Sequence, residues 1–187
     1  MIMKRKLDIA SRFCCLLLLW MSLFLTGCTD APKEQVLFDF ESDSELDQFE
    51  WKCHTLFSLS DEHVTHGKHS LKLSLFPPGY AGLHSLTERR NWRAFRNFCF
   101  DVYNAERESL MLSVRIDDEK AYPDYKDRYN QGFHIGPGMN QVCIPIDSMA
   151  TSGTQRKIDA GNIYRFLIFT MPAKEILLYL DNIRLIP

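Results

Sequence analysis

The sequence lacks the short motifs that identify common enzyme chemistries. It contains no Gly-x-Ser-x-Gly nucleophile elbow, no His-Glu-x-x-His metal motif and no phosphate-binding glycine loop. Internal repeats and low-complexity tracts are missing too. These absences exclude the enzyme classes that such motifs mark, and we predict that the protein is not an enzyme.

An excess of charge of one sign is missing as well. The 22 lysine and arginine residues are matched by 24 aspartate and glutamate residues, which gives a net charge of −2. This balance provides no basic surface for nucleic acid, so we predict no nucleic-acid partner. Hydrophobic residues make up 45% of the 187 residues, too many for a disordered chain, and the length fits one domain with a tail.

Long apolar runs are also missing. A membrane-spanning helix needs about 20 apolar residues, whereas the run from Phe13 to Leu25 near the N-terminus has 13. Lys4, Arg5 and Lys6 precede this run, and the combination has the proportions of a secretory signal peptide. The first 27 residues are therefore predicted to be a targeting segment.

This segment ends in Leu25-Thr26-Gly27-Cys28, which resembles the lipobox of bacterial lipoproteins. The resemblance implies cleavage before Cys28 and acylation of Cys28 by chains such as palmitate, which together hold a protein on a lipid bilayer. Residues 28–35 would then be a lipidated N-terminus and polar tether. Because Thr29 rather than an acidic residue follows the cysteine, we expect the outer membrane of a Gram-negative envelope rather than the inner. An ordinary secretory signal and a transmembrane anchor are the alternatives.

Residues 36–187 show the pattern of an all-β domain. Short stretches of period-2 alternation are separated by turn residues, and no long segment has the 3.6-residue period of a helix. This pattern is typical of a β-sandwich. The predicted strands are 36–40, 70–75, 98–103, 110–116, 129–135, 141–146, 164–169 and 176–185.

Several sequence phrases in this region together resemble a galactose-binding-like jelly roll of the carbohydrate-binding-module type. In chain order they are Phe38-Asp39-Phe40-Glu41, Thr65 to Leu73, Asn91 to Phe98, Asp127-Arg128-Tyr129-Asn130, Gly138-Met139-Asn140 and Leu178 to Ile183. The resemblance covers nearly all of residues 36–187. It implies a jelly-roll β-sandwich and a carbohydrate partner, without identifying the sugar.

Three carboxylates are the candidate metal ligands. Asp39 and Glu41 belong to the first predicted strand and Asp181 to the last. Hard oxygen ligands suit Ca²⁺, and the resemblance implies a structural calcium ion that ties the two ends of the domain together. The alternative is that these carboxylates are solvated residues at strand ends.

The candidate ligand-binding residues come from a loop and from two neighbouring strands. Sugars are bound by aromatic rings that stack on their apolar faces and by directed hydrogen bonds to their hydroxyl groups. The loop supplies aromatic and polar groups, and the outward strand faces add others. The predicted residues are Arg115, Asp117, Tyr122, Tyr125, Asp127, Arg128, Asn130 and His134. The alternative for Asp127 and Arg128 is an ion pair that only holds the loop.

After signal cleavage and lipidation, Cys53, Cys99 and Cys143 remain. In a jelly roll the strands of Cys99 and Cys143 are neighbours, and the alternation points both side chains outward. A disulfide then requires the two residues to face each other closely. A register change by one residue would leave all three as free thiols.

These observations predict a non-catalytic, membrane-anchored envelope lipoprotein whose sandwich binds carbohydrate. An envelope protein that binds or assembles with another protein is the second hypothesis. A small polysaccharide-active enzyme is the third, because Asp117 with Asp127 could serve glycoside hydrolysis.

Overall fold

The computed structural model describes residues 33–51 and 54–187. Both ranges belong to one compact unit. The predicted signal peptide, the predicted lipidation site Cys28, most of the predicted tether and Cys53 lie outside the described residues. Among the residues that are described, no helix has the length and apolarity to cross a bilayer.

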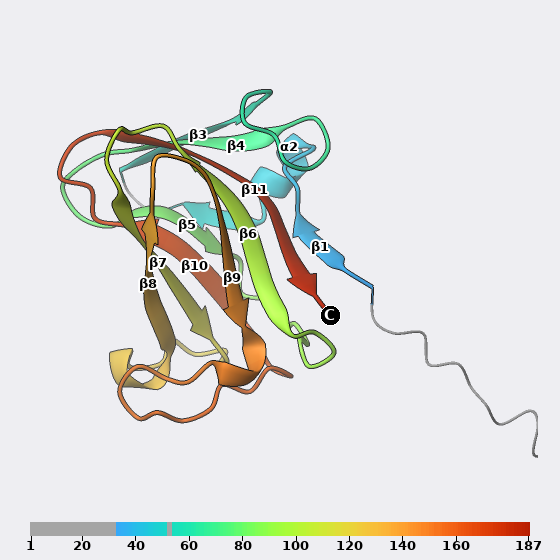
Figure 1. Cartoon of the computed structure of the whole chain (residues 1–187). Coiled ribbons are helices and arrows are strands. Elements are labelled where there is room, and N and C mark those ends of the chain that lie inside the picture. Colours follow the sequence, from blue (N-terminus) through green and yellow to red (C-terminus); the bar gives the residue numbers. More distant parts are fainter. Residues whose placement is uncertain (1–32, 52–53) are drawn as a thin grey trace, which may run out of the picture. The chain divides into compact units, whose positions relative to one another are not determined.

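The described chain is built almost entirely of β-strands, with one short α-helix and two 3-10 helices (Figure 1). The elements are β1 (Gln35–Phe38), α2 (Asp43–Leu46), β2 (Phe49–Trp51), β3 (Thr55–Ser60), β4 (Ser70–Leu75), β5 (Ala81–Ser85), β6 (Asn97–Asn104), β7 (Leu110–Asp117), η1 (Tyr125–Asp127), β8 (Tyr129–Ile135), β9 (Gly138–Pro145), η2 (Ile146–Ser148), β10 (Arg165–Thr170) and β11 (Ile176–Ile186).

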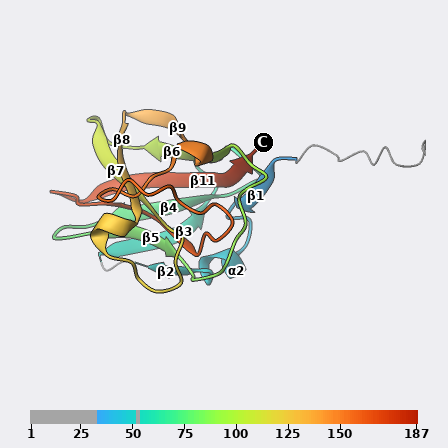
Figure 2. The same ribbon diagram turned by 90° about the horizontal axis from the view of Figure 1, so that it is seen from below.

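The strands form two antiparallel sheets. The first sheet has the order β3-β4-β11-β6-β9, and β1 pairs with the C-terminal half of β11 beside β4. The second sheet has the order β2-β5-β10-β7-β8. Seen from below, β9 and β8 lie at the same edge of the two sheets, and β3 and β2 lie toward the opposite edge (Figure 2). The prediction of an all-β jelly-roll sandwich is confirmed.

The hydrophobic core lies between the inner faces of the sheets. Phe98 of β6 stacks on Trp92 with ring centroids 4.9 Å apart, and it contacts Phe166 of β10 at 5.2 Å. All three side chains are fully buried. The inner residues of β7, such as Leu112 and Val114, are buried as the alternation predicts. Apolar side chains on every second position therefore hold the two sheets together.

Cys99 and Cys143 form a disulfide, as the jelly-roll strand order implied. They are directly opposite each other in the register of β6 and β9, with Cα atoms 4.2 Å apart. The bond joins β9, at the edge of the first sheet as the structure describes it, to its neighbour β6. Because it closes a segment of 44 residues, it stabilises the fold by roughly 4 kcal/mol in the loop-entropy description.

Candidate functional site

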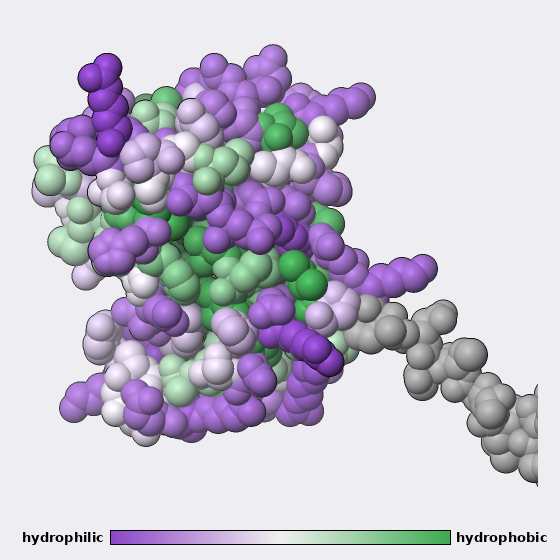
Figure 3. Space-filling model, in the orientation of Figure 1, coloured by the Kyte–Doolittle hydropathy of each residue, from purple (hydrophilic) through white to green (hydrophobic). Residues whose placement is uncertain are grey.

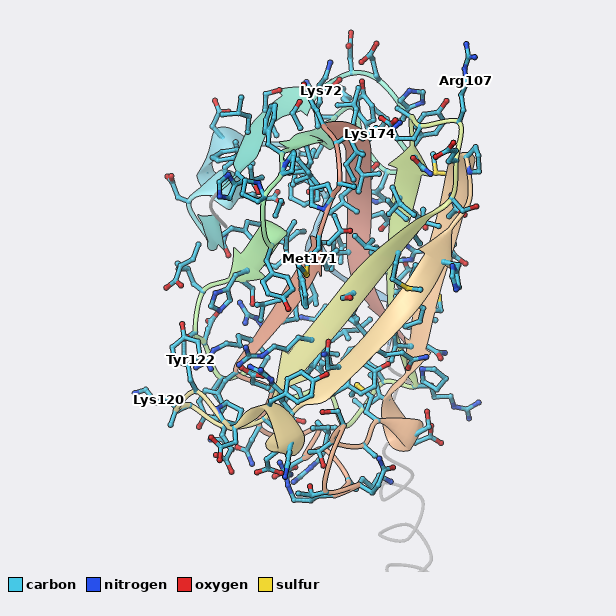
Figure 4. The ribbon with its side chains drawn as sticks, turned by 90° about the vertical axis from the view of Figure 1, so that its left-hand side faces the viewer. Lys72, Arg107, Lys120, Tyr122, Met171 and Lys174 are labelled. Atoms are coloured by element: carbon cyan, nitrogen blue, oxygen red, sulfur yellow. A yellow bond between two sulfur atoms is a disulfide. The ribbon has the colours of Figure 1, made fainter. Side chains whose placement is uncertain are left out.

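A groove of about 640 Å³ lies on the outer face of the second sheet. Its walls come from β7, β8 and β10, from the segment Met171–Lys174 and from loop residues that include Tyr80 and Tyr125. Hydrophobic residues show across the middle of the molecule, and hydrophilic residues dominate its upper and lower margins (Figure 3). Met171 lies between Lys174 toward one end of this side of the molecule and Tyr122 toward the other (Figure 4).

Small residues share one cross-strand row of the second sheet. In this row Gly82 of β5 is opposite Phe169 of β10, which is opposite Ser113 of β7, and Ser113 is opposite Gly132 of β8. Gly82 has a φ of +143°, and a Cβ atom there would lie 2.2 Å from the carbonyl oxygen of Ile168. The backbone at Gly82 therefore admits only glycine. Of these small residues Ser113 lines the groove, whereas Gly82 is buried and the Met111 side chain lies over Gly132.

Aromatic and apolar side chains form the sides of the groove. Tyr80 is 58% exposed and packs edge-on against Phe169 with ring centroids 5.4 Å apart. Tyr125, Met111 and Met171 are also exposed and line the groove. Exposed aromatic rings suit stacking against the apolar face of a ring-shaped ligand.

Arg115 is fixed at the base of the groove by a buried carboxylate. Its Nε and Nη2 atoms each donate to an Asp117 oxygen at 2.7 Å. The Arg165 guanidinium donates to the same carboxylate at 3.0 Å, and Asp117 and Arg165 are both almost wholly buried. The ring of Tyr122 lies 4.2 Å from the Arg165 guanidinium carbon. One carboxylate therefore holds two arginines, and Tyr122 covers the second.

Arg128 follows η1 and lines the groove beside Arg115. Its guanidinium carbon lies 5.1 Å from the centroid of the Tyr125 ring, within the range of a cation–π contact. Burial and the nearby positive charge of Arg115 lower the pKa of Arg128. Its Nε atom is buried and has no hydrogen-bond partner among the described residues. Asn130 on β8 completes this end of the groove, with its amide nitrogen 3.4 Å from the Tyr125 hydroxyl.

The structure brings half of the predicted ligand-binding residues together. Arg115, Tyr125, Arg128 and Asn130 all line the groove. His134 is exposed on β8 but lies outside the lining. The role of these residues in ligand binding stays a prediction, and the groove now gives it a location.

The other predicted residues have structural partners. Asp117 is fully buried between two arginines, and Tyr122 packs on Arg165, so neither belongs to the lining. Asp127 pairs with the Nε atom of Arg156 at 2.9 Å. The alternative of an Asp127–Arg128 ion pair is therefore wrong, because the partner of Asp127 is Arg156. Asp127 does hold the loop, as that alternative supposed.

Sequence reasoning missed several groove residues. Tyr80 and the segment Met171–Lys174 lie outside the predicted strands, next to proline and glycine residues that indicated only turns. Met111 and Leu167 lie on strands, and the alternation alone placed both on the outer side. Strand alternation was therefore the only signal that could have found any of them.

The three predicted metal ligands all contact the turn at Thr65–His69. Asp181 accepts hydrogen bonds from the backbone amides of Thr65 at 2.6 Å and His66 at 2.8 Å. Glu41 accepts two more from the turn, from Lys68 at 2.7 Å and His69 at 2.8 Å. These amide contacts lower the pKa of Glu41, whereas burial raises the pKa of Asp181.

Asp39 completes this arrangement through an ion pair, with its Oδ2 atom 3.2 Å from the Nδ1 atom of His66. In the part of the chain that the structure describes, no three carboxylate, histidine or cysteine side chains are grouped as metal ligands. Backbone N–H groups donate to Glu41 Oε1 and to both oxygens of Asp181, so in this arrangement these oxygens hold the turn. Calcium binding itself stays an untested prediction.

Comparisons with known proteins identify the type of fold. No protein-family model matches the chain, and no curated protein matches it. Among solved structures, several carbohydrate-binding modules and agarases are similar. The fold is thus the jelly-roll β-sandwich of carbohydrate-binding modules.

The family 11 carbohydrate-binding module of a cellulosomal cellulase of Clostridium thermocellum aligns with a TM-score of 0.61 and 15% identity, over 83% of this chain and 95% of the module. The same module has been solved in complex with a β-1,3-1,4-mixed-linked tetrasaccharide. An exo-β-agarase aligns with a TM-score of 0.64 and 18% identity, over 81% of this chain. This chain spans only about a quarter of the agarase, at 25%. At these identities the likeness shows a shared fold.

Proposed function

We propose that the protein is a non-catalytic carbohydrate-binding lipoprotein of the bacterial envelope, and that an oligosaccharide binds in the groove. One observation carries the proposal. In a fold shared with carbohydrate-binding modules, the groove joins exposed rings of Tyr80 and Tyr125 to polar groups of Arg115, Arg128 and Asn130. Rings for stacking and fixed hydrogen-bond donors are what a sugar site requires.

The groove also supports a binding role over catalysis. Glycoside hydrolysis uses two carboxyl groups about 5–9.5 Å apart on either side of the scissile bond. No carboxylate is present among the described residues that line the groove. The nearest candidate of the sequence, Asp117, is buried and engaged by two arginines. The residues around the groove therefore offer contacts for a sugar without an acid–base pair.

Attachment to the envelope rests on the sequence around Cys28. The lipobox-like Leu25-Thr26-Gly27-Cys28 supports lipidation, and several acyl chains are needed for stable anchoring. Cys28→Ser should release the protein from the membrane fraction or leave it unprocessed. Equal incorporation of radioactive palmitate into wild type and mutant would contradict the lipid anchor.

A glycan array probed with the full-length protein in mild detergent tests the binding function. We expect binding to a defined set of polysaccharides and a loss of roughly tenfold or more in affinity for Tyr80→Ala, because one stacking contact of about 1–2 kcal/mol is removed. Leu56→Ala is the matched control, because Leu56 is 66% exposed on β3 of the first sheet. Equal affinities of the two variants would move the site away from the groove. A protein that binds no glycan but retains a protein partner would favour the interaction module.

A further inference from the structure

The groove is positively charged in a chain that is slightly acidic overall. Its lining includes Arg115, Arg128 and Lys174, and no acidic residue is found among the lining residues that the structure describes. The whole sequence has 22 basic and 24 acidic residues. The positive charge of the lining therefore does not come from the overall composition. The ion pairs of each basic residue show where positive charge is left without a counter-charge.

Arg115, which lines one end of the groove, shares the carboxylate of Asp117 with the buried Arg165. The Asp117 carboxylate binds Arg115 through two hydrogen bonds of 2.7 Å and Arg165 through one of 3.0 Å. Asp117 carries one negative charge against two positive charges, and no second carboxylate lies within ion-pair distance of Arg115 or Arg165 in the described chain. The cluster keeps a net positive charge at the base of the groove.

Arg128 adds a third cation beside this cluster. It makes no ion pair with any described carboxylate, and its buried Nε atom has no hydrogen-bond partner among the described residues. Buried polar atoms in folded proteins are nearly always paired. Burial lowers the pKa of Arg128, and the positive charge of Arg115 lowers it further. An anion placed between the two side chains would relieve the repulsion and supply the missing acceptor.

Lys174 at the other end of the groove differs from these arginines. Its Nζ atom lies 3.0 Å from an oxygen of Glu106, and its side chain is 65% exposed. An exposed pair of this kind is close to neutral and contributes little. The unbalanced charge is therefore concentrated near Arg115 and Arg128, beside Tyr125 and Asn130.

We propose, resting on the proposed carbohydrate-binding function, that the groove selects an anionic oligosaccharide and that Arg115 and Arg128 bind the carboxylate or sulfate group of one sugar residue. Guanidinium groups bind both anions through paired hydrogen bonds. The rings of Tyr80 and Tyr125 then contact the sugar, which distinguishes an acidic glycan from a free inorganic anion. The proposed selectivity is argued from this chain's own arginines alone.

Titration calorimetry with the full-length protein in detergent tests the inference with ligands matched in pairs. One arm compares oligogalacturonate with its methyl ester, and the other compares a sulfated carrageenan oligosaccharide with its desulfated form. We expect one acidic ligand to bind about tenfold more tightly than its neutral partner, as for one or two charge-assisted hydrogen bonds. The arm that shows the difference identifies the anion. Higher salt should weaken this preference.

Arg128→Gln should reduce the affinity for the acidic ligand about tenfold and leave the affinity for the neutral partner nearly unchanged. Arg107→Gln is the control, because Arg107 is exposed on the loop before β7 and its removal changes the net charge equally. Arg115 is not substituted, because its loss would leave the buried Asp117 with one partner fewer. Thermal unfolding of both variants verifies that they fold.

The outcomes separate this inference from the function on which it rests. Equal binding of acidic and neutral glycans, unaffected by Arg128→Gln, would overturn the selectivity and leave sugar binding in place. Binding of no glycan in either arm would overturn the inference, and it would overturn the sugar-binding function as well if the glycan array is also negative. Loss of acidic binding in Arg107→Gln to the same degree as in Arg128→Gln would show a nonspecific charge effect and would also overturn the inference.

Discussion

The outer faces of the two sheets carry similar kinds of side chain but differ in what covers them. On the first sheet, Tyr179 of β11 and Tyr103 of β6 are opposite each other, and both rings point outward. His63 stacks on Tyr103 with ring centroids 3.4 Å apart and meets Tyr179 at 4.6 Å. The Tyr179 hydroxyl donates to Glu62 at 2.5 Å. The segment before β4 therefore covers the aromatic rings of this face.

The charges of the first sheet are also matched within the molecule. Arg184 of β11 contacts Asp101 of β6 at 3.1 Å, and the side chain of Gln141 donates to the same carboxylate at 3.1 Å. Thr65 from the covering turn adds another hydrogen bond to Asp101 at 3.0 Å. On the second sheet, by contrast, Arg128 has no such partner in the described chain, and the rings of Tyr80 and Tyr125 are exposed.

This contrast teaches that residue type and strand orientation are insufficient to identify a binding face. Both sheets place aromatic and charged residues outward by the same period-2 rule. A turn lies over the first, closed face, whereas the second, open face carries the groove with the exposed side chains of Tyr80, Tyr125 and Met171. The contacts from outside the strands decide which face can accept a ligand.

The largest expected effect concerns the buried charge under the open face. Asp117→Asn should lower the free energy of unfolding by about 3–5 kcal/mol, because removing one partner leaves the buried Arg165 without a counter-charge. Arg165 also donates to the carbonyl oxygens of Lys120 and Ala121, so those loop contacts should weaken too. Urea denaturation measures the change. A loss no larger than that of the exposed Arg107→Gln would show that Arg165 does not need the Asp117 carboxylate.

The next effect concerns the closed face, which the disulfide reinforces. Cys143→Ser should lower the free energy of unfolding by about 2–4 kcal/mol, because the bridge restricts the unfolded chain between β6 and β9. Groove affinity should not change, since both cysteines belong to the first sheet. Denaturation with and without a reducing agent checks the prediction. If reduction of the wild type changed nothing, the bridge would not form in solution.

The smallest effect concerns the turn that covers the closed face. The amides of Lys68 and His69 lower the pKa of Glu41 in the folded protein. A lowered folded-state pKa means that the stabilisation is present above the unfolded-state pKa and is lost as the pH falls through the folded-state pKa. Glu41→Gln should therefore lose less stability than wild type between pH 6 and about pH 3.

Glu119→Gln provides the comparison for this last prediction, because Glu119 is an exposed carboxylate far from the turn in sequence. Thermal unfolding at several pH values measures both variants. Parallel pH profiles for wild type and Glu41→Gln would contradict the role of Glu41 in holding the turn.

Much of the fold followed from the sequence because clean alternation reports burial. The stretch that became β7 was recognised because apolar Leu112 and Val114 alternate with polar residues, and β6 was recognised for the same reason. The strands β2, β3 and β5 were missed. β5 has only five residues with a glycine among them, and β3 exposes Leu56, so neither has a regular apolar face.

The candidate site could be predicted only in part, for a physical reason. Local sequence placed Tyr125, Arg128 and Asn130 in one loop, and alternation placed Arg115 outward. Tyr80 reaches the groove from a turn that precedes Arg115 by 35 residues (115 − 80), so only the folded sheet brings it there. Similarly, nothing local to Asp127 could reveal that its partner is Arg156. The local sequence pattern carries no information on contacts between residues that are far apart in the chain.

The pairing of β1 with β11 has a mechanical consequence for a domain tethered by its N-terminus. Gln35, Val36 and Phe38 pair with the C-terminal half of β11, and Phe38 is buried in the core. A pulling force that enters at Gln35 is thus transmitted to the central strand of the first sheet. When the force runs along the strand axis, the hydrogen bonds of β1 bear the load together rather than one after another. If the groove held a polymer while the tether held the membrane, tension would pass through the body of the sandwich, with β1 as the first element to resist it.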